Sequence, residues 1–304
     1  MGEPVKPPIN YYGGKARLAP RIAALFPPHR VYLEVFYGSA AVLFAKRPAP
    51  HEVLNDLDSC VVSFFSVLRE RPDDLVRACR LTPYAREEFA AAGLTDPSVD
   101  QLELARRFFV RLTQGFNKTI ATDPRSVGWS ASVLRGSNNA RTAANLVERF
   151  HQCAERLRHV TIECRPAVEC IEAYAVADGV VYADPPYLAG TRASLAKRVA
   201  DYSVEYNSEA DHRELAAVLC ASPATVFLSG YHSALYDELY GDWHRVERRV
   251  LVSASNQAGA SRHAVEVVRS NRPIACQLRF DGEPGALAAG ECPAPQAGDR
   301  TASG

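Results

Sequence analysis

The chain has 304 residues, of which 47% are hydrophobic and 23% are charged, and 35 Lys and Arg residues balance 35 Asp and Glu residues. This length and composition predict a soluble protein with a large core, and the zero net charge of the whole chain argues weakly against a nucleic-acid partner. No uncharged apolar run reaches the roughly 18 residues that span a bilayer, and the first residues lack an apolar signal block, so we expect a cytoplasmic protein without a membrane partner.

Strands and helices are expected to alternate along the chain, with one long interruption. The apolar runs predict strands at 31–36, 52–55, 160–164, 180–184, 225–229, 246–252 and 265–270. Helices are predicted at about 39–46, 59–69, 145–157, 168–174, 208–219 and 233–240. This alternation is typical of an α/β fold with a doubly wound sheet.

The stretch 72–145 breaks the alternation. It has helical character at 84–92 and 102–112, followed by a loop rich in Gly, Ser, Asn and Thr. We therefore predict a catalytic domain made of 1–71 and 146–280, interrupted by a mainly helical inserted domain at 72–145. Gly, Pro and Ala dominate residues 281–304, which we expect to be a disordered tail.

The local charge of the insert and its flank differs from the balance of the whole chain. Residues 101–160 contain ten Arg or Lys residues and four Asp or Glu residues, together with Phe108, Phe109, Phe116 and Trp129. Basic residues interleaved with aromatic rings suit a surface that follows phosphates and stacks bases, and they equally fit a solvated helical face.

Metal chemistry finds no support in the sequence. The eight cysteines are scattered without a Cys-x-x-Cys pair, and the eight histidines form neither His-x-x-x-His nor His-Glu-x-x-His. Structural and catalytic zinc sites use such spacings. We therefore expect no metal, and buried free thiols in place of disulfides.

Two segments suggest a cofactor that contains adenosine. The first predicted strand ends in Glu34-Val35-Phe36-Tyr37-Gly38-Ser39, the kind of acidic, aromatic and glycine turn that brings backbone close to a cofactor in doubly wound folds. Asp56 closes the second strand, where a carboxylate can accept hydrogen bonds from a ribose diol or cap the following helix.

The N-terminal segment could lie against the same cofactor. Asn10-Tyr11-Tyr12-Gly13-Gly14-Lys15 combines aromatic rings, two glycines and a cation. A phosphate-binding Walker A loop is excluded, because it needs an earlier glycine and a Ser or Thr after the lysine, where this chain has Ala16.

The most informative segment is Asp184-Pro185-Pro186-Tyr187, at the end of the apolar run that begins at Gly179. This tetrapeptide arises by chance in roughly one chain of this length in a thousand. Its sequence of a carboxylate, two prolines and an aromatic ring indicates methyl transfer to an exocyclic amine.

The order of these segments resembles that of the Dam-type and phage-type DNA adenine N6-methyltransferases of the α class. The resemblance covers about residues 9–271 and extends to Leu228-Ser229-Gly230-Tyr231, with smaller matches at His212, Glu266 and Asn271. It implies a Rossmann-like methyltransferase sheet with an inserted target-recognition domain. It also implies a bacterial or phage-encoded enzyme that uses S-adenosylmethionine and acts on double-stranded DNA.

The resemblance also implies roles for particular residues. The catalytic loop would comprise Asp184, Pro185, Pro186 and Tyr187. S-adenosylmethionine would be held by Tyr11, Lys15, Glu34, Phe36, Gly38, Ser39, Asp56 and Asp184. DNA would be contacted by Arg107, Arg111, Lys118, Arg125, Arg135 and Arg141.

The catalytic loop suits this chemistry for physical reasons. Asp184 would accept one N6 hydrogen and the Pro185 carbonyl the other, which aims the nitrogen lone pair at the methyl group. Tyr187 would stack on the extruded base and offset part of the cost of flipping it.

One departure and two alternatives accompany this interpretation. Many relatives have a second glycine where this chain has Ala40, and we expect its methyl group to narrow the space through which the cofactor approaches.

The acceptor could be another amine, such as N4 of cytosine, adenine in RNA or a glutamine side chain, although Asp at position 184 favours DNA adenine. A non-catalytic DNA-binding relative is the other alternative, against which the intact Lys15, Asp56 and Asp184 argue. The sequence leaves open whether a restriction endonuclease is a partner.

Overall fold

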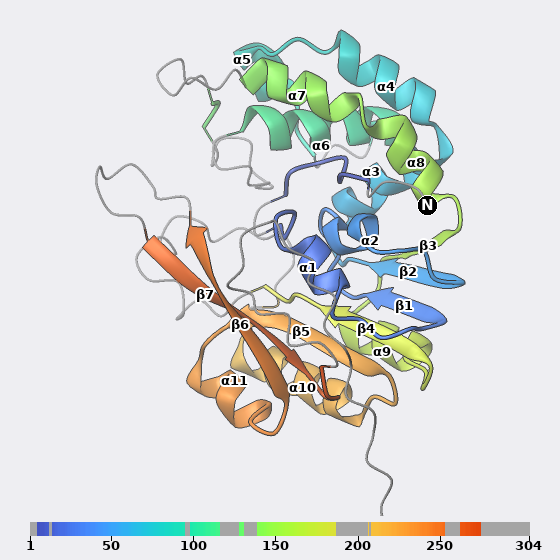
Figure 1. Cartoon of the computed structure of the whole chain (residues 1–304). Helices are drawn as coiled ribbons and strands as arrows, with labels where there is room; N and C mark the ends of the chain where they lie inside the picture. The colour runs from blue at the N-terminus through green and yellow to red at the C-terminus, as the bar shows by residue number, and fades with distance from the viewer. Residues whose placement is uncertain are drawn as a thin grey trace, which may run out of the picture.

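A mixed sheet forms the centre of the molecule (Figure 1). The computed structural model describes residues 5–11, 14–94, 98–115, 128–130, 139–186, 206, 208–252 and 262–274. Within them the strands are β1 (Val31–Glu34), β2 (His51–Asn55), β3 (Val160–Glu163), β4 (Gly179–Ala183), β5 (Thr225–Tyr231), β6 (His244–Val252) and β7 (Arg262–Ser270). They lie in the order β3-β2-β1-β4-β5-β7-β6. The strands from β3 to β5 are parallel, and β7 is antiparallel to both β5 and β6, which confirms the predicted α/β fold.

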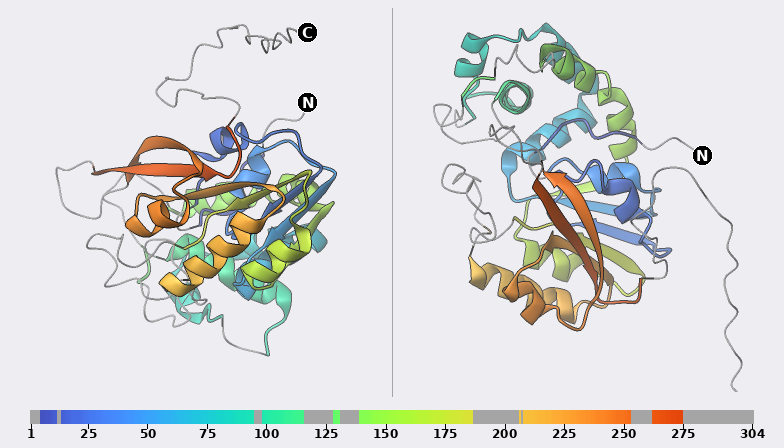
Figure 2. Two further views of the ribbon diagram at one scale, coloured as in Figure 1. Left: turned by 90° about the horizontal axis from the view of Figure 1, so that it is seen from below. Right: turned by 60° about the vertical axis from the view of Figure 1, so that its left-hand side comes forward.

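Helices cover both faces of the sheet, so that the central strands are buried on two sides. One face carries α1 (Ala19–Ala23), α2 (Ala41–Ala45) and α3 (Ser59–Glu70), and the other carries α9 (Ala167–Tyr174), α10 (Glu209–Ala221) and α11 (Ala234–Leu239) (Figures 1 and 2). Because successive side chains of a strand point to opposite faces, Tyr32 packs into the first apolar cluster and Leu33 into the second. This double burial explains why these strands are almost continuous apolar runs.

A block of helices stands on α3, above the first face of the sheet (Figure 2). It consists of α4 (Pro72–Leu81), α5 (Arg86–Ala91), α6 (Gln101–Gln114), α7 (Asn139–Val147) and α8 (Phe150–Leu157). The ring of Phe64 on α3 lies 5.4 Å from that of Phe108 on α6 and 5.7 Å from that of Phe150 on α8, measured between centroids. The helical block therefore shares one apolar cluster with the sheet.

Helix α4 and helix α1 were not among the predicted elements. Pro72 is at the start of α4, and Asp73 and Asp74 occupy its first turn. Proline is well tolerated at that position, and acidic groups in the first turn interact favourably with the helix dipole, so these residues are helix-start signals. The single helix predicted at 145–157 is two helices, α7 and α8. The predicted tail at 281–304 lies outside the described residues.

The sheet has its topological switch point between β1 and β4. From β1 the chain proceeds to β2 and β3 on one side, and from β4 it proceeds to β5 on the other. Doubly wound folds bind ligands at the carboxyl ends of the strands at such a point. No helix in the described ranges is long and apolar enough to cross a membrane.

Asn55 holds three segments together at this edge. Its side-chain amide donates hydrogen bonds to the carbonyls of Val35 and Arg165, at 3.1 and 3.0 Å, and its side-chain oxygen accepts one from the Arg165 amide at 3.0 Å. The residue is 1% exposed, so water cannot replace these bonds. Asn55 thereby fixes the turns that follow β1 and β3.

We predict that Asn55→Ala lowers the free energy of unfolding by about 2–3 kcal/mol, because buried backbone groups lose their partners. Urea denaturation followed by circular dichroism measures the change. Asn139→Ala is the matched control, since Asn139 is only partly buried and its side-chain amide donates a hydrogen bond to Ser130 Oγ at 3.1 Å. Equal losses in the two variants would contradict the proposed role of Asn55.

Candidate active site

The turn after β1 brings backbone into close contact with the N-terminal segment. Gly38 has φ 46°, and a Cβ atom there would lie 3.0 Å from Cδ1 of Tyr11. Only glycine adopts this conformation without a steric cost and leaves room for the ring. The Tyr11 carbonyl accepts a hydrogen bond from the Gly14 amide at 3.0 Å, which turns the chain toward Lys15.

Ala40 also has a left-handed conformation, with φ 52°. It is fully buried within the apolar cluster beneath the turn, so its methyl group packs into the core. The expectation that this methyl group narrows the space through which the cofactor approaches the turn is therefore wrong. The cost lies in the backbone, since a left-handed alanine is disfavoured by about 1 kcal/mol.

Asp56 lies next to the Gly38 turn and stabilises it. Its Oδ2 accepts a hydrogen bond from the Gly38 amide at 2.9 Å, and its Oδ1 accepts one from the Asp58 amide at 3.0 Å. Burial raises the pKa of Asp56 to about 6, although these two backbone amides oppose the shift. Each carboxylate oxygen can accept a second hydrogen bond, such as one from a hydroxyl group.

Glu34 is buried beneath the same turn, 2% exposed. Its Oε2 accepts hydrogen bonds from the Tyr32 hydroxyl at 2.8 Å and from the Leu43 amide at 3.0 Å. Leu43 is in the first turn of α2, whose N-cap, Ala40, offers no side-chain acceptor. Burial raises the pKa of Glu34 to about 8. Glu34 thus caps α2 from the strand below, a structural role that the sequence did not indicate.

The loop after β4 places a carboxylate beside a buried cation. Lys15 Nζ lies 3.0 Å from Asp184 Oδ1 and 3.2 Å from Glu266 Oε1. Burial alone would lower the pKa of Lys15, but the two carboxylates more than offset this and raise it above its ordinary value. The lysine therefore stays charged and binds two acids.

His212 lies against the loop that follows β4. It is 1% exposed, and its Nδ1 lies 3.0 Å from the hydroxyl oxygen of Tyr236. Burial lowers the pKa of His212, and contact with the Pro186 backbone partly opposes this. The ring of Tyr206 lies between two other rings. Its centroid is 6.0 Å from that of the His212 imidazole and 5.3 Å from that of Phe36. The sequence had marked His212 as a match without assigning it a role.

The predicted cofactor residues lie together at the carboxyl ends of the parallel strands. Of the predicted catalytic loop, Tyr187 lies outside the described residues. Pro185 is buried, Pro186 is partly buried and Ser39 is 4% exposed. Among the described residues, no group of three or more His, Cys, Asp or Glu side chains could hold a metal ion.

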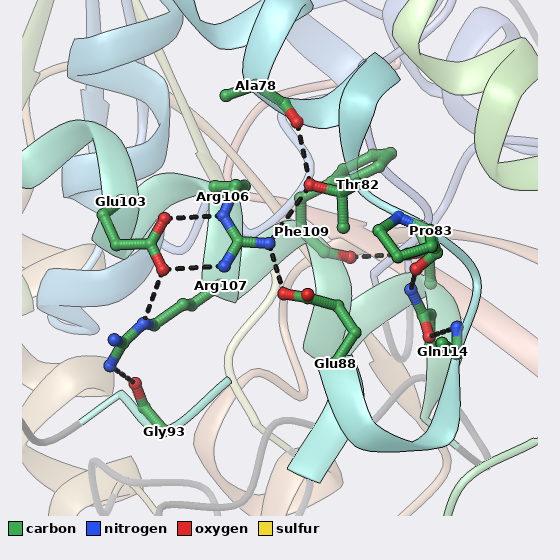
Figure 3. A network of polar contacts seen from close by, with 12 residues as sticks. Ala78, Thr82, Pro83, Glu88, Gly93, Glu103, Arg106, Arg107, Phe109 and Gln114 are labelled. Carbon is green, nitrogen blue, oxygen red and sulfur yellow. Dashed lines mark hydrogen bonds and ion pairs between the residues drawn. The ribbon is translucent and has the colours of Figure 1, made fainter. Parts of the chain in front are cut away.

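The arginines predicted to contact DNA have different environments. Arg107 donates to Glu103 Oε1 at 2.8 Å and to the Gly93 carbonyl at 3.2 Å, beside an Arg106 that binds Glu88 and Glu103 (Figure 3). These arginines hold the helices of the insert together.

Arg111 does not suit its predicted role. It is 1% exposed, and its guanidinium lies 4.1 Å from the centroid of the Phe89 ring. A side chain buried this deeply cannot reach a phosphate, so the prediction is corrected to a packing role. Arg141 is exposed on α7, and Lys118, Arg125 and Arg135 lie outside the described residues.

Glu34 generates a prediction about pH. Between pH 4.5 and about pH 8 the folded protein retains a proton that the unfolded chain releases, so this residue reduces stability as the pH rises through that window. Glu34→Gln removes the effect. Its stability relative to the wild type should rise by a few kcal/mol, in order of magnitude, between pH 5 and pH 8.

Urea denaturation at several pH values measures this difference. Glu172→Gln, on an exposed position of α9, provides the control and should parallel the wild type. A constant difference between the Glu34 variant and the wild type would rule out the titration of Glu34.

Comparison with known proteins agrees with this geometry. The chain is 25% identical to the Type II methyltransferase M1.LlaDCHI of Lactococcus lactis subsp. cremoris, covering 80% of this chain and 88% of the relative. It is 26% identical to a DNA adenine methylase of Serratia marcescens, with 81% and 89% covered, and 24% identical to one of Salmonella typhimurium, with 87% and 95% covered. The family model of the D12 class matches residues 11–253. The chain therefore belongs to the D12 class of N6 adenine-specific DNA methyltransferases.

Proposed function

We propose that the protein transfers a methyl group from S-adenosylmethionine to N6 of an adenine extruded from double-stranded DNA, at a specific sequence, and that Asp184 holds the amine. The observation that carries this proposal is the position of Asp184. It follows β4 at the switch point of the sheet, and its Oδ1 is bound by Lys15 at 3.0 Å. Family membership supports adenine in DNA as the acceptor.

The residues at the edge of the sheet fit S-adenosylmethionine. At Gly38 no side chain covers the backbone of the turn, and the partly buried Tyr11 ring lies against it. Asp56 retains acceptor capacity for the hydroxyls of a ribose. Phe36 and Ser39 flank this turn, and Lys15 and Asp184 are next to it. When bound, S-adenosylmethionine supplies a methyl group on a positively charged sulfur.

Asp184 and its neighbours account for the activation of the amine. The N6 lone pair is delocalised into the adenine ring, which makes the amine a poor nucleophile. Lys15 binds Oδ1 of Asp184, so Oδ2 can accept one N6 hydrogen while the Pro185 carbonyl accepts the other. Proline at 185 and 186 removes backbone amides that would compete for the carboxylate. Tyr187 would stack on the extruded base.

DNA would lie against the inserted helices. Our proposed contacts remain Arg107, Arg141 and the basic residues 118, 125 and 135, and Arg111 is removed from this set because it is buried.

The proposed methyl transfer is tested directly by digesting DNA from an expressing host to nucleosides and measuring modified bases. N6-methyladenine is expected; N4-methylcytosine alone, or no modified base, would contradict the proposal.

We predict that Asp184→Asn reduces the rate of methyl transfer by two to three orders of magnitude, in line with the loss of a group that stabilises a transition state. The amide has the same shape but is a weaker acceptor, and Lys15 keeps its contact with Glu266, so the fold should persist. Transfer of labelled methyl to DNA gives the rate. Asp178→Asn, which removes an exposed carboxylate just before β4, should retain full activity. Wild-type turnover by the Asp184 variant would remove this residue from the mechanism.

We predict that Asp56→Ala weakens the binding of S-adenosylmethionine by about one to two orders of magnitude, because hydrogen bonds to a carboxylate are lost and the Gly38 amide loses its partner. Isothermal titration calorimetry measures the affinity. Asp58→Ala removes the neighbouring carboxylate, which caps α3 through the Cys60 amide at 2.9 Å, and should leave the affinity nearly unchanged. Equal affinities of the Asp56 variant and the wild type would sink the assignment.

A further inference from the structure

The site contains a second buried carboxylate that the activation of the amine does not use. Glu266 is 5% exposed and lies 3.2 Å from Lys15 Nζ through its Oε1. It comes from β7, opposite Tyr231 in the last residue pair that joins β7 to β5. Beyond this pair, β7 continues only with β6, as far as the pair Val252 and Arg262. Glu266 thus sits where the hairpin leaves the sheet, beside the catalytic loop.

We propose that Glu266 is a positioning residue for methyl transfer, which shares the charge of Lys15 so that Asp184 keeps its strength as an acceptor. The proposal rests on the function assigned above. It adds a third charged residue to the pair formed by Lys15 and Asp184.

The charge balance of the cluster gives the reason. Lys15 carries one positive charge, and Asp184 and Glu266 each carry one negative charge when ionised. Arg248 on β6 is the cross-strand partner of Glu266 and brings a further positive charge to its neighbourhood. Methyl transfer brings a positive sulfur to this place and moves positive charge toward N6. Each negative charge kept beside Lys15 stabilises that positive charge in a site largely withdrawn from water, so the loss of Glu266 makes the site one charge more positive.

Without Glu266, Lys15 and Asp184 would form a neutral pair. The whole ammonium charge would then act on Asp184, and a carboxylate neutralised in this way accepts a hydrogen bond from N6 less strongly. Lys15 Nζ would also be free to move onto both oxygens of Asp184, including Oδ2, which the amine requires. Glu266 holds the ammonium on the Oδ1 side.

A purely structural role makes a different prediction. If Glu266 only satisfied a buried lysine, its loss would lower the stability of the protein and weaken its affinities for S-adenosylmethionine and DNA. The proposed role instead lowers the rate of the chemical step while the two affinities stay close to those of the wild type.

The test is Glu266→Gln, measured in single turnovers with labelled S-adenosylmethionine and duplex DNA, each at saturating concentration. We expect the rate constant to fall by about one to two orders of magnitude, with the affinities for both substrates within about twofold of the wild type. Glu247→Gln, on the same hairpin but 41% exposed, provides the matched control and should match the wild type.

Glu266→Asp keeps the negative charge but shortens the side chain, which moves the carboxylate away from Lys15 Nζ. It should show a smaller loss of rate than the glutamine variant, and it decides the question if the glutamine variant does not fold. An unchanged single-turnover rate, or a loss fully explained by weaker substrate binding, overturns the role of Glu266. If the wild type produces no N6-methyladenine in this assay, the proposed function fails. If the wild type is active and the Glu266 variants are equally active, only the inference about Glu266 fails.

Discussion

One buried ammonium group joins three parts of the chain that are far apart in sequence. Lys15 follows the N-terminal turn, Asp184 follows β4 and Glu266 lies on β7, and the two acids are 3.0 and 3.2 Å from the same nitrogen. Withdrawing a charge from water is costly, so a lysine 8% exposed holds its place only while its partners do. This constraint keeps the N-terminal segment across the carboxyl ends of the strands, with Tyr11 against Gly38.

The turn after β1 takes its shape from acids outside it. Asp56 binds the Gly38 amide, and Glu34 binds the Leu43 amide at the start of α2. Between these two contacts Ala40 adopts a left-handed conformation that costs about 1 kcal/mol. The two acids fix the backbone on either side of Ala40 and so hold the turn in this conformation.

The sequence was informative wherever one local pattern decided the structure. Strands β1, β2 and β4 are largely apolar runs, and the segments after them carry the predicted Gly38, Asp56 and Asp184, respectively. Interactions between distant segments were not legible in this way. Glu34 could not be recognised as the cap of α2, nor Arg111 as a buried partner of Phe89, because neither contact follows from spacing along the chain. Helix α4 was not predicted, although Pro72 occupies a position at its start that proline favours.

The position of α3 connects the proposed recognition of DNA with the binding of the cofactor. This helix begins at Ser59, just after Asp56, with Asp58 as its N-cap, and its Phe64 packs against α6 and α8 of the helical block. Packed cores transmit displacements because they contain few voids. The aromatic cluster around Phe64 therefore joins the helical block, where DNA contacts are proposed, to the helix whose N-cap residue, Asp58, donates its amide to the carboxylate of Asp56.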